Sequence, residues 1–439
     1  MFENKKIFVL GMARSGYNVA KLLADKNEII VTDKTEQDEN KIMELKSLGV
    51  KFIQTDSPSD YFDESFDMLI INPGIAMSHD TIQMAINLNK PVFNEMEVAY
   101  HFIPEGVTII GVTGSNGKTT TTTMIYELLK GMNKSVVLGG NIGYPLSEVV
   151  GDLKSGDILL LEISDHQLIN FKDFKTNISV LTNICPTHLD FHGSYENYMM
   201  AKKRIFNNQI ESDLAIINFT NEDSMEITKD IVPTKVYFNN DTTYVRDNAI
   251  YVNNEKIINL DDIKVKGMHN YENIMAALLV INEFGIDKDI VYKFLNTFKG
   301  VEHRIEFVCE KNGVNYYNDS KATNPTSTVV ALSSFNKPVH LILGGMERGQ
   351  DFHELDCVIN NVKCIYAIGE VSDRILNYAN EVNITAVKCD ILKVAIDKIK
   401  ENVSEGEVVL LSPACASWDQ YAKFEDRGDE FKKYCEEIK

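Results

Sequence analysis

The chain contains 439 residues, enough for about three domains at roughly 150 residues each. Hydrophobic residues make up 44% and charged residues 25% of it, a composition typical of folded globular proteins rather than disordered ones. The 64 acidic side chains outnumber the 44 basic ones, which gives a formal net charge of −20. This charge argues against general binding to nucleic acids or anionic membranes, because both need a basic footprint.

The seven cysteines are scattered and form no C-x-x-C pair, which argues against a disulfide framework and against a cysteine-ligated zinc site. In the opening MFENKKIFVLGMARSG, glycine and arginine interrupt the apolar run too soon for a signal peptide. No window approaches the run of about 18 apolar residues that a transmembrane helix needs. We therefore expect a cytoplasmic protein that does not insert into membranes.

Short apolar runs alternate with helical patterns along the whole chain, which predicts an α/β fold with parallel sheets covered by helices. The pattern restarts twice and divides the chain into three predicted domains, 1–95, 96–300 and 301–439. We expect strands at 6–12, 27–33, 51–56, 67–74 and 91–94, then at 108–113, 134–140, 157–164, 178–184 and 213–219, and finally at 307–319, 338–345, 363–369 and 407–414. Long helices are expected at 15–26, at 269–284 and from about Ser417 onward.

The strongest local motif is GVTGSNGKTT, which follows an apolar strand and opens a helix. Glycines let backbone N–H groups approach phosphates, the helix N-terminus adds a positive dipole end, and Lys118 can reach the terminal phosphates. The Thr119 hydroxyl is placed to hold Mg²⁺. The standard spacing G-x-x-x-x-G-K-[ST] needs a glycine where Val112 stands, so a glycine-rich turn without a ligand remains the alternative.

The loop from Gly11 to Gly16 is a weaker nucleotide signal, because it lacks the middle glycine of G-x-G-x-x-G. Asp33 ends the next strand, where an acidic residue can meet a ribose hydroxyl. A purely structural strand-to-helix turn is an equally good interpretation of this loop.

Three further side chains could belong to a metal site near the phosphate loop. Glu162 and His188 each follow an apolar strand, and the carboxyl ends of parallel strands are where ligands bind. Lys202 shares a helical stripe with apolar residues, so its pKa should fall, and a neutral amine can react with carbon dioxide to give a carbamate. A lysine that reaches solvent from an amphipathic helix is the simpler interpretation.

The third block carries three polar loops at predicted strand ends, which could converge on one pocket or remain separate surface loops. The first contains His303, Arg304 and NDSKATNP, the second Arg348, and the third ACASWDQ.

Together these motifs resemble the Mur ligases of bacterial cell-wall synthesis. The matching segments run in the family order across nearly the whole chain: GVTGSNGKTT, GGNIG, LEIS, AKKRIF, GMHNYEN, EHR, NDSKATNP and LLSPACASWDQ. NDSKATN and SPACAS point to the members of the family that add D-glutamate.

The resemblance implies a three-domain enzyme: a Rossmann-like N-terminal domain that binds the UDP part of the substrate, a central P-loop α/β domain that binds ATP, and a C-terminal Rossmann-like domain that closes over the site. ATP would phosphorylate the carboxylate of UDP-N-acetylmuramoyl-L-alanine to an acyl phosphate, and the amine of D-glutamate would then form an amide. A monomer with two Mg²⁺ ions and no macromolecular partner is implied.

The resemblance also assigns residue roles. Catalysis would involve Lys118, Glu162, His188, Lys202 and Lys321. One Mg²⁺ would be bound by Thr119 and Glu162, and the second by His188 and a carbamylated Lys202. ATP would contact Gly114, Ser115, Asn116, Gly117, Lys118, Thr119, Thr120, Thr121, Asn270, Asn273, Arg304 and Asp319. The UDP-sugar would contact Ser15, Asp33, Asn72, Gly74 and Asn141, and D-glutamate Thr323, Arg348, Ser417 and Phe424.

The chain departs from the family pattern at three positions, two of them directly after LEIS and one in the proposed D-glutamate pocket. Asp165 and His166 stand where the family often has serine and phenylalanine, and Arg348 stands where some members have lysine. Arginine binds a carboxylate through two parallel hydrogen bonds, so the pose of D-glutamate can differ.

Two other functions are weighed against the D-glutamate ligase. One is a related ligase of different specificity, such as a folylpolyglutamate synthetase or another cell-wall ligase. The other is a P-loop switch or dinucleotide-binding protein, but the sequence has no N-K-x-D segment for guanine and no middle glycine for a dehydrogenase.

Overall fold

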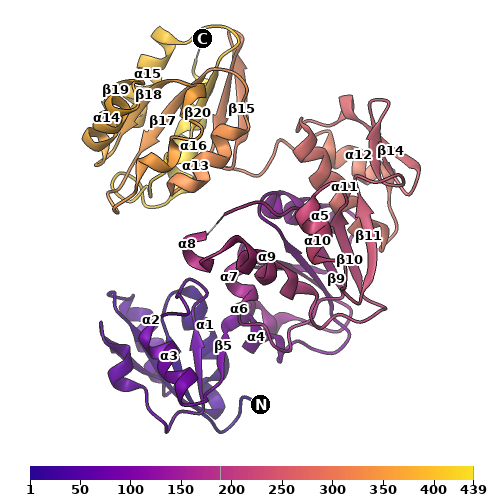
Figure 1. Ribbon diagram of the computed structural model, residues 1–439, viewed down its shortest axis with the longest axis vertical. Helices are drawn as coiled ribbons and strands as arrows, with labels where there is room; N and C mark the ends of the chain where they lie inside the picture. Colours follow the sequence, from indigo (N-terminus) through magenta and orange to yellow (C-terminus); the bar gives the residue numbers. More distant parts are fainter. Residues whose placement is uncertain (188, 439) are drawn as a thin grey trace. The chain divides into compact units, whose positions relative to one another are not determined.

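A computed structural model describes residues 1–187 and 189–438. The chain forms two compact units, which divide between Thr297 and Phe298 (Figure 1). Within the described residues, no helix combines the length and the apolar character needed to cross a membrane.

The first unit begins with a five-stranded parallel sheet in the order β3-β2-β1-β4-β5. The direction of strand addition reverses between β1 and β4, as it does in Rossmann-type halves, and ligands bind at such a switch point. Apolar side chains cover both faces of the sheet. The strands are β1 (Lys6–Leu10), β2 (Glu28–Asp33), β3 (Lys51–Gln54), β4 (Met68–Ile71) and β5 (Val92–Asn94), and the helices are α1 (Arg14–Leu23), α2 (Glu39–Ser47), α3 (Asp80–Asn87) and α4 (Glu95–Tyr100).

The second sheet of this unit has six parallel strands in the order β11-β10-β9-β6-β8-β7. In this sheet the direction of strand addition reverses at β6, and β6 leads directly into the phosphate loop. The strands are β6 (Thr108–Thr113), β7 (Val136–Gly140), β8 (Ile158–Glu162), β9 (Ile178–Leu181), β10 (Leu214–Asn218) and β11 (Thr234–Phe238). The helices are α5 (Lys118–Gly131), α6 (Leu146–Val149), α7 (Asp165–Leu168), α8 (Leu189–His192), α9 (Tyr195–Lys203), α10 (Glu222–Ile227), α11 (Met268–Asn282) and α12 (Lys288–Leu295).

A small antiparallel sheet precedes α11 and was not predicted. It consists of β12 (Tyr244–Arg246), β13 (Ala249–Val252) and β14 (Glu255–Asn259). Asn and Asp residues at positive φ make its tight turns, with Asp247 and Asn248 in the first and Asn253 and Asn254 in the second.

The second unit contains one six-stranded sheet in the order β15-β16-β20-β17-β18-β19, in which only the β15–β16 pair is antiparallel. Its two apolar faces form separate cores. The strands are β15 (Glu306–Lys311), β16 (Val314–Asn318), β17 (Val339–Gly344), β18 (Val362–Ile368), β19 (Thr385–Asp390) and β20 (Val408–Leu411), and the helices are α13 (Pro325–Ser333), α14 (Ser372–Glu381), α15 (Leu392–Asn402) and α16 (Phe424–Glu436).

The predicted α/β class with parallel sheets is confirmed, and each strand run expected from the sequence contains a strand. The expected helix start near Ser417 is wrong, because α16 begins at Phe424. Ser417 instead opens a turn that its carbonyl closes with the amides of Gln420 and Tyr421, and the carboxylate of Asp419 is held by the Glu370 amide. Glu425 and Asp426 then supply negative charge to the first turn of α16, where the helix dipole favours it.

Candidate functional site

The phosphate loop between β6 and α5 requires glycine at two positions. Gly114 has φ +144°, and a Cβ there would lie 2.0 Å from the Thr182 hydroxyl oxygen. Gly117 has φ +82°, and its Cβ would lie 2.2 Å from the side-chain oxygen of Asn273. Only glycine tolerates both the left-handed backbone and this close approach. The loop is therefore shaped by contacts with neighbouring elements as well as by its own sequence.

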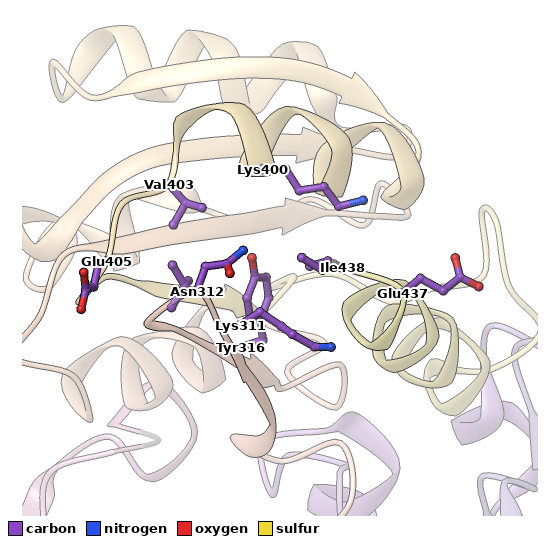
Figure 2. A pocket seen from close by; sticks show the side chains of 9 residues that line it. Lys311, Asn312, Tyr316, Lys400, Val403, Glu405, Glu437 and Ile438 are labelled. Carbon is purple, nitrogen blue, oxygen red and sulfur yellow. The ribbon is translucent and has the colours of Figure 1, made fainter.

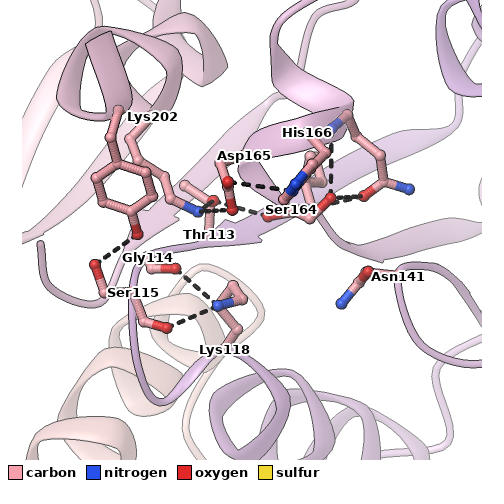
Figure 3. A network of polar contacts seen from close by, with 12 residues as sticks. Thr113, Gly114, Ser115, Lys118, Asn141, Ser164, Asp165, His166 and Lys202 are labelled. Carbon is pink, nitrogen blue, oxygen red and sulfur yellow. Dashed lines mark hydrogen bonds and ion pairs between the residues drawn. The ribbon is translucent and has the colours of Figure 1, made fainter. Parts of the chain in front are cut away.

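Lys118 lies across this loop. Its amine donates to the carbonyl oxygens of Gly114 and Ser115, both at 2.8 Å (Figure 3). The Ser115 and Asn116 amides donate to Asn183, which fixes the loop against the segment after β9. A lysine held over a glycine loop at a helix N-terminus provides positive charge for phosphates.

The first turns of α5 carry the threonines that follow the lysine. Thr119 is buried, Thr120 is half-buried, and the buried Thr121 hydroxyl donates to Asn273 of α11 at 3.2 Å. Asn270, one turn earlier on α11, donates to the Lys266 carbonyl. Asn273 therefore lies at the phosphate loop and contacts both Gly117 and Thr121, whereas Asn270 makes a local contact within its own segment.

Glu162 ends β8 beside β6 and is almost completely buried. One of its carboxylate oxygens accepts a hydrogen bond from the Asn141 side chain at 2.7 Å, and the other has no hydrogen-bond partner among the described residues. A buried carboxylate oxygen without a partner is costly unless a ligand completes it. Carboxylate oxygen is also the donor that Mg²⁺ prefers, so this side chain fits a magnesium ligand.

Lys202 is completely buried on α9, below Tyr198 on the same helix face. Its amine lies 3.2 Å from the Thr113 hydroxyl and 3.3 Å from Asp165 (Figure 3). Burial, together with the positive charge of Lys118, lowers the pKa of Lys202 to about 7. The predicted fall in pKa is confirmed, and the alternative of a lysine that reaches solvent is wrong, because no part of the side chain is exposed.

Asp165 is the first residue of α7, placed there by a capping box between Ser164 and Gln167. Besides Lys202, its carboxylate contacts His192 Nε2 at 2.8 Å and His166 Nδ1 at 3.2 Å. Burial acts to raise the pKa of Asp165, but the hydrogen bond from His166 and the charge of Lys202 outweigh it and hold the pKa far below its usual range. The departure at Asp165 therefore provides Lys202 with an ionised partner.

The N-terminal loop holds its predicted residues at the switch point of the first sheet. Asp33 accepts from the Met12 amide at 2.7 Å and, through its other oxygen, from Thr35. Ser15 lies in the first turn of α1, and Asn72 follows β4 and approaches Gly11. Asp33 thus fixes the N-terminal loop through the hydrogen bond from Met12, whereas Gly74, which follows β4, is exposed.

In the second unit, the predicted residues lie at the carboxyl edge of the sheet. Asp319 follows β16 and is buried, accepting from the Ser412 hydroxyl at 2.7 Å and the Ile305 amide at 3.2 Å. Burial raises the pKa of Asp319 to about 7, although these hydrogen bonds act against it. Arg304 and Thr323 are exposed, and Lys321 is half-buried with its amide on the His303 carbonyl.

The amino-acid residues predicted from the resemblance occupy two loops and a helix start in this unit. Arg348 lies over the ring of Trp418, 5.5 Å from its centroid. Ser417, the residue before this tryptophan, is buried, and its hydroxyl has no partner among the described residues. Phe424 opens α16 and packs against His303.

A cavity of about 470 Å³ lies in the second unit near Tyr316, Lys400 and Val403 (Figure 2). Its lining residue Val314 begins β16, whereas Asp319 follows the end of that strand. A strand rises about 3.3 Å per residue, so the length of β16 separates the cavity from Asp319. The cavity lies at the amino ends of the parallel strands and the predicted residues lie at their carboxyl ends. We therefore do not include this cavity in the candidate site.

The predicted residues thus lie in three places: the N-terminal loop, the phosphate-loop region with Asn141, Glu162 and Lys202, and the second unit. His188, predicted as a metal ligand, lies outside the described residues. The sequence analysis did not identify His192 or Arg427. Arg427 is buried in α16 and donates to the carbonyls of Ser320 and Cys415, and its position four residues before Phe431 on an apolar face was the available signal.

Three family models match consecutive parts of the chain: the N-terminal domain of MurD-like Mur ligases at residues 5–94, the Mur ligase middle domain at 112–281, and the Mur ligase glutamate ligase domain at 303–415. The chain is similar to the UDP-N-acetylmuramoylalanine–D-glutamate ligase of Streptococcus agalactiae, with 42% identity over 98% of this chain and 96% of the relative. The enzyme of the same name from Geobacillus kaustophilus is 40% identical over 98% and 97%.

Solved structures resemble the chain in fold. The UDP-N-acetylmuramate-alanine ligase MurC of Thermotoga maritima aligns with 99% of this chain and 100% of its own, with a TM-score of 0.57 and 19% identity. MurF of Acinetobacter baumannii aligns over 97% and 93%, with a TM-score of 0.58 and 15% identity.

Proposed function

The chain belongs to the Mur ligase family, and on that premise we propose that it joins D-glutamate to UDP-N-acetylmuramoyl-L-alanine in peptidoglycan synthesis, using ATP. The observation that carries this function is the full-length similarity to enzymes named for the reaction, at 40–42% identity. The glycine loop with Lys118, Glu162 and Lys202 supports the ATP-dependent step. Family membership removes the alternative of a P-loop switch or dinucleotide-binding protein.

In the first step, an oxygen of the substrate's terminal carboxylate attacks the γ-phosphorus of ATP, the bond to the β-phosphate oxygen breaks, and ADP leaves. Lys118 and the first-turn amides of α5 hold the β- and γ-phosphates, and Asn270, Asn273, Arg304 and Asp319 are proposed ATP contacts. Thr119 and Glu162 would hold Mg²⁺, which neutralises charge on the phosphates and the carboxylate when bound.

In the second step, the amine of D-glutamate attacks the acyl carbon, phosphate leaves, and the nitrogen loses a proton. We propose Thr323, Arg348, Ser417 and Phe424 as the residues that bind D-glutamate, with Lys321 as a catalytic cation. The Ser417 hydroxyl, which has no partner in the described part of the chain, and the exposed Arg348 guanidinium support this assignment, because a carboxylate needs hydrogen-bond donors of this kind.

We propose that Lys202 is carbamylated. The neutral amine nitrogen bonds to the carbon of CO₂ and releases a proton to solvent, which converts a cation into an anionic oxygen ligand. The lowered pKa supports this step, because it makes the neutral amine accessible near neutral pH. With His188, the carbamate would hold a second Mg²⁺. The ion pair with Asp165 belongs to the cationic lysine, and His166 and His192 remain as partners of the Asp165 carboxylate after carbamylation.

The remaining assignments follow from the same premise. We propose the domains 1–95, 96–300 and 301–439, with the UDP-sugar held by Ser15, Asp33, Asn72, Gly74 and Asn141 of the first unit. We also propose that the enzyme acts as a monomer in the cytoplasm and that growth, shape and division of the cell depend on its product.

The decisive experiment measures phosphate release by the purified protein. We expect release to require ATP, Mg²⁺, UDP-N-acetylmuramoyl-L-alanine and D-glutamate together. Equal turnover with L-glutamate or with a folate would show a related ligase of different specificity. Failure to bind ATP with magnesium at millimolar concentration would refute the proposed reaction as a whole.

A further inference from the structure

Arg14 connects the N-terminal loop to a loop of the second sheet. Its guanidinium donates to the Gly143 carbonyl at 2.9 Å and lies over the ring of Tyr144, 4.5 Å from the centroid. It also makes two hydrogen bonds to the carboxylate of Glu148, at 3.1 and 3.3 Å, and Asn18 donates to the same carboxylate at 2.9 Å. One side chain at the start of α1 therefore makes three separate contacts with residues 143–148.

The segment that Arg14 contacts is a closed loop. The Gly140 amide donates to the Tyr144 carbonyl at 2.9 Å, so the two ends of the loop are joined. Gly140 and Gly143 both have positive φ, which lets the backbone turn tightly between them. Residues 140–144 therefore form one short turn that contains both Asn141 and the residues that Arg14 contacts.

The opposite side of this loop rests on Glu162. The Asn141 amide donates to the Glu162 carbonyl at 2.8 Å, and the Asn141 side chain donates to the Glu162 carboxylate at 2.7 Å. A Cβ at Gly140 would lie only 2.3 Å from the same carbonyl oxygen, so the loop approaches the end of β8 very closely. Arg14 and Glu162 thus both contact the same short loop, Arg14 at Gly143 and Tyr144 and Glu162 at Asn141.

We propose that Arg14 is a positioning residue for the ligase reaction. By fixing residues 140–144, it keeps Asn141 on one oxygen of Glu162 and leaves the other oxygen for a magnesium ion. This role rests on the proposed function, in which the Glu162 carboxylate binds Mg²⁺. Arg14 also connects two proposed parts of the site. One is the N-terminal loop, which carries Ser15 and in which the Met12 amide donates to Asp33, and the other is the proposed metal ligand Glu162.

The ion pair with Glu148 does not by itself carry this proposal. About half of the Arg14 side chain and a third of the Glu148 side chain are exposed, and exposed ion pairs contribute little to stability. The carbonyl contact at Gly143 and the stacking on Tyr144 are different, because they act directly on the loop that holds Asn141. Lysine can keep the charge but cannot make this planar set of contacts.

The test compares Arg14→Ala and Arg14→Lys with Arg246→Ala. Arg246 is a matched control, because its guanidinium also stacks on an aromatic ring, that of Tyr244 at 4.7 Å, and pairs with a neighbouring acid, but on the small antiparallel sheet. Backbone hydrogen exchange of residues 138–146 is measured without ligands. Mn²⁺ binding in the presence of ADP is measured by electron paramagnetic resonance, and kcat and KM for each substrate follow from phosphate release.

We expect Arg14→Ala to speed exchange in this segment and to weaken Mn²⁺ binding about tenfold, with a matching fall in kcat at low Mg²⁺. Arg14→Lys should recover only part of the loss, and Arg246→Ala should match the parent protein. A higher KM for the UDP-sugar with unchanged exchange and unchanged Mn²⁺ binding would overturn the proposal, since Arg14 would then act only on that substrate. The exchange result stands even if the parent protein proves to have another ligase specificity.

Discussion

The Lys202 amine lies 3.3 Å from a carboxylate oxygen of Asp165, and both side chains are buried. Two histidines contact the same carboxylate, so Asp165 keeps hydrogen-bond partners when the lysine loses its positive charge. The cationic lysine pairs with this carboxylate, whereas conversion to a carbamate would end the ion pair. This arrangement leads to the first prediction.

Lys202→Ala should abolish phosphate release, because the proposed anionic oxygen ligand is lost. Short-chain carboxylates added to the variant should restore part of the activity by occupying the space of the carbamate. Lys203→Ala is the matched control, since Lys203 is the next residue and pairs with Asp230 at the surface. Activity close to that of the parent protein in Lys202→Ala would discard the carbamate.

Arg348→Ala should raise the KM for D-glutamate about tenfold to a hundredfold and leave the KM for ATP nearly unchanged. A charge-assisted hydrogen bond is worth about 1.5–3 kcal/mol, which sets this range. Arg348→Lys should show an intermediate value, because it keeps the charge without the two-pronged geometry. An unchanged KM for D-glutamate in Arg348→Ala would remove this residue from the pocket.

Asp319→Asn should change how stability depends on pH. The carboxyl of the unfolded chain ionises near pH 4 and that of the folded protein at about 7. Between these values the folded state binds more protons, so a rise in pH through this interval destabilises the parent protein, by about 4 kcal/mol at most. Asp319→Asn cannot ionise at this position and should not show this loss. The free energy of unfolding of the variant, relative to that of the parent, should therefore be higher at pH 8 than at pH 5.

Urea unfolding at the two pH values measures this difference. Glu310→Gln, which removes an exposed carboxyl of β15 in the same unit, is the control for the loss of a carboxyl as such. An equal pH dependence for Asp319→Asn and the parent protein would contradict the proposed cost of ionising the buried carboxyl.

Gly117→Ala should weaken ATP binding at least about tenfold and lower the free energy of unfolding by about 1–3 kcal/mol, because the new Cβ meets Asn273 at a strained backbone position. Gly151→Ala is a suitable control, since among the described residues no heavy atom other than those of its chain neighbours lies within 4 Å of the position its Cβ would take. Isothermal titration with ATP and thermal unfolding measure the two effects. An ATP affinity equal to that of the parent would show that the loop does not need its present shape.

Most of the parallel strands were predictable because their runs are largely apolar, as ILLLE at β8 illustrates. The edge strands β11 (TKVYF) and β19 (TAVKCD) were missed, because lysine and other polar residues interrupt their apolar runs. The strands of the small antiparallel sheet were not predictable, because YVR and EKIIN are short and mix polar with apolar residues. The Asn-rich turns between them stabilise the sheet only when the strands are already paired. The start of α16 was missed for a similar reason: Asp419 is held by the distant Glu370 amide, a contact that no local pattern encodes.

The candidate site was predictable where residue type and spacing carry the chemistry, as at Gly114, Gly117 and Lys118. The helical stripe indicated a partly apolar face around Lys202, but a side chain that reaches solvent was the simpler interpretation, and its complete burial was not predicted. Its partner could not be predicted either, because Asp165 and His192 are brought to it by two other short helices. Arg14 was overlooked because its proposed role depends on a loop more than 120 residues away in sequence. The first residue of that loop that it contacts is Gly143.

The chain contains one tryptophan, Trp418, and most of its side chain is exposed beside Arg348. Its indole emission therefore reports on a single place in the molecule, with no background from other indoles. Adding D-glutamate in the absence of nucleotide should shift or quench this fluorescence if the amino acid pulls the guanidinium from the ring. The protein thus carries an intrinsic optical probe that can follow occupancy of the proposed amino-acid pocket without any turnover.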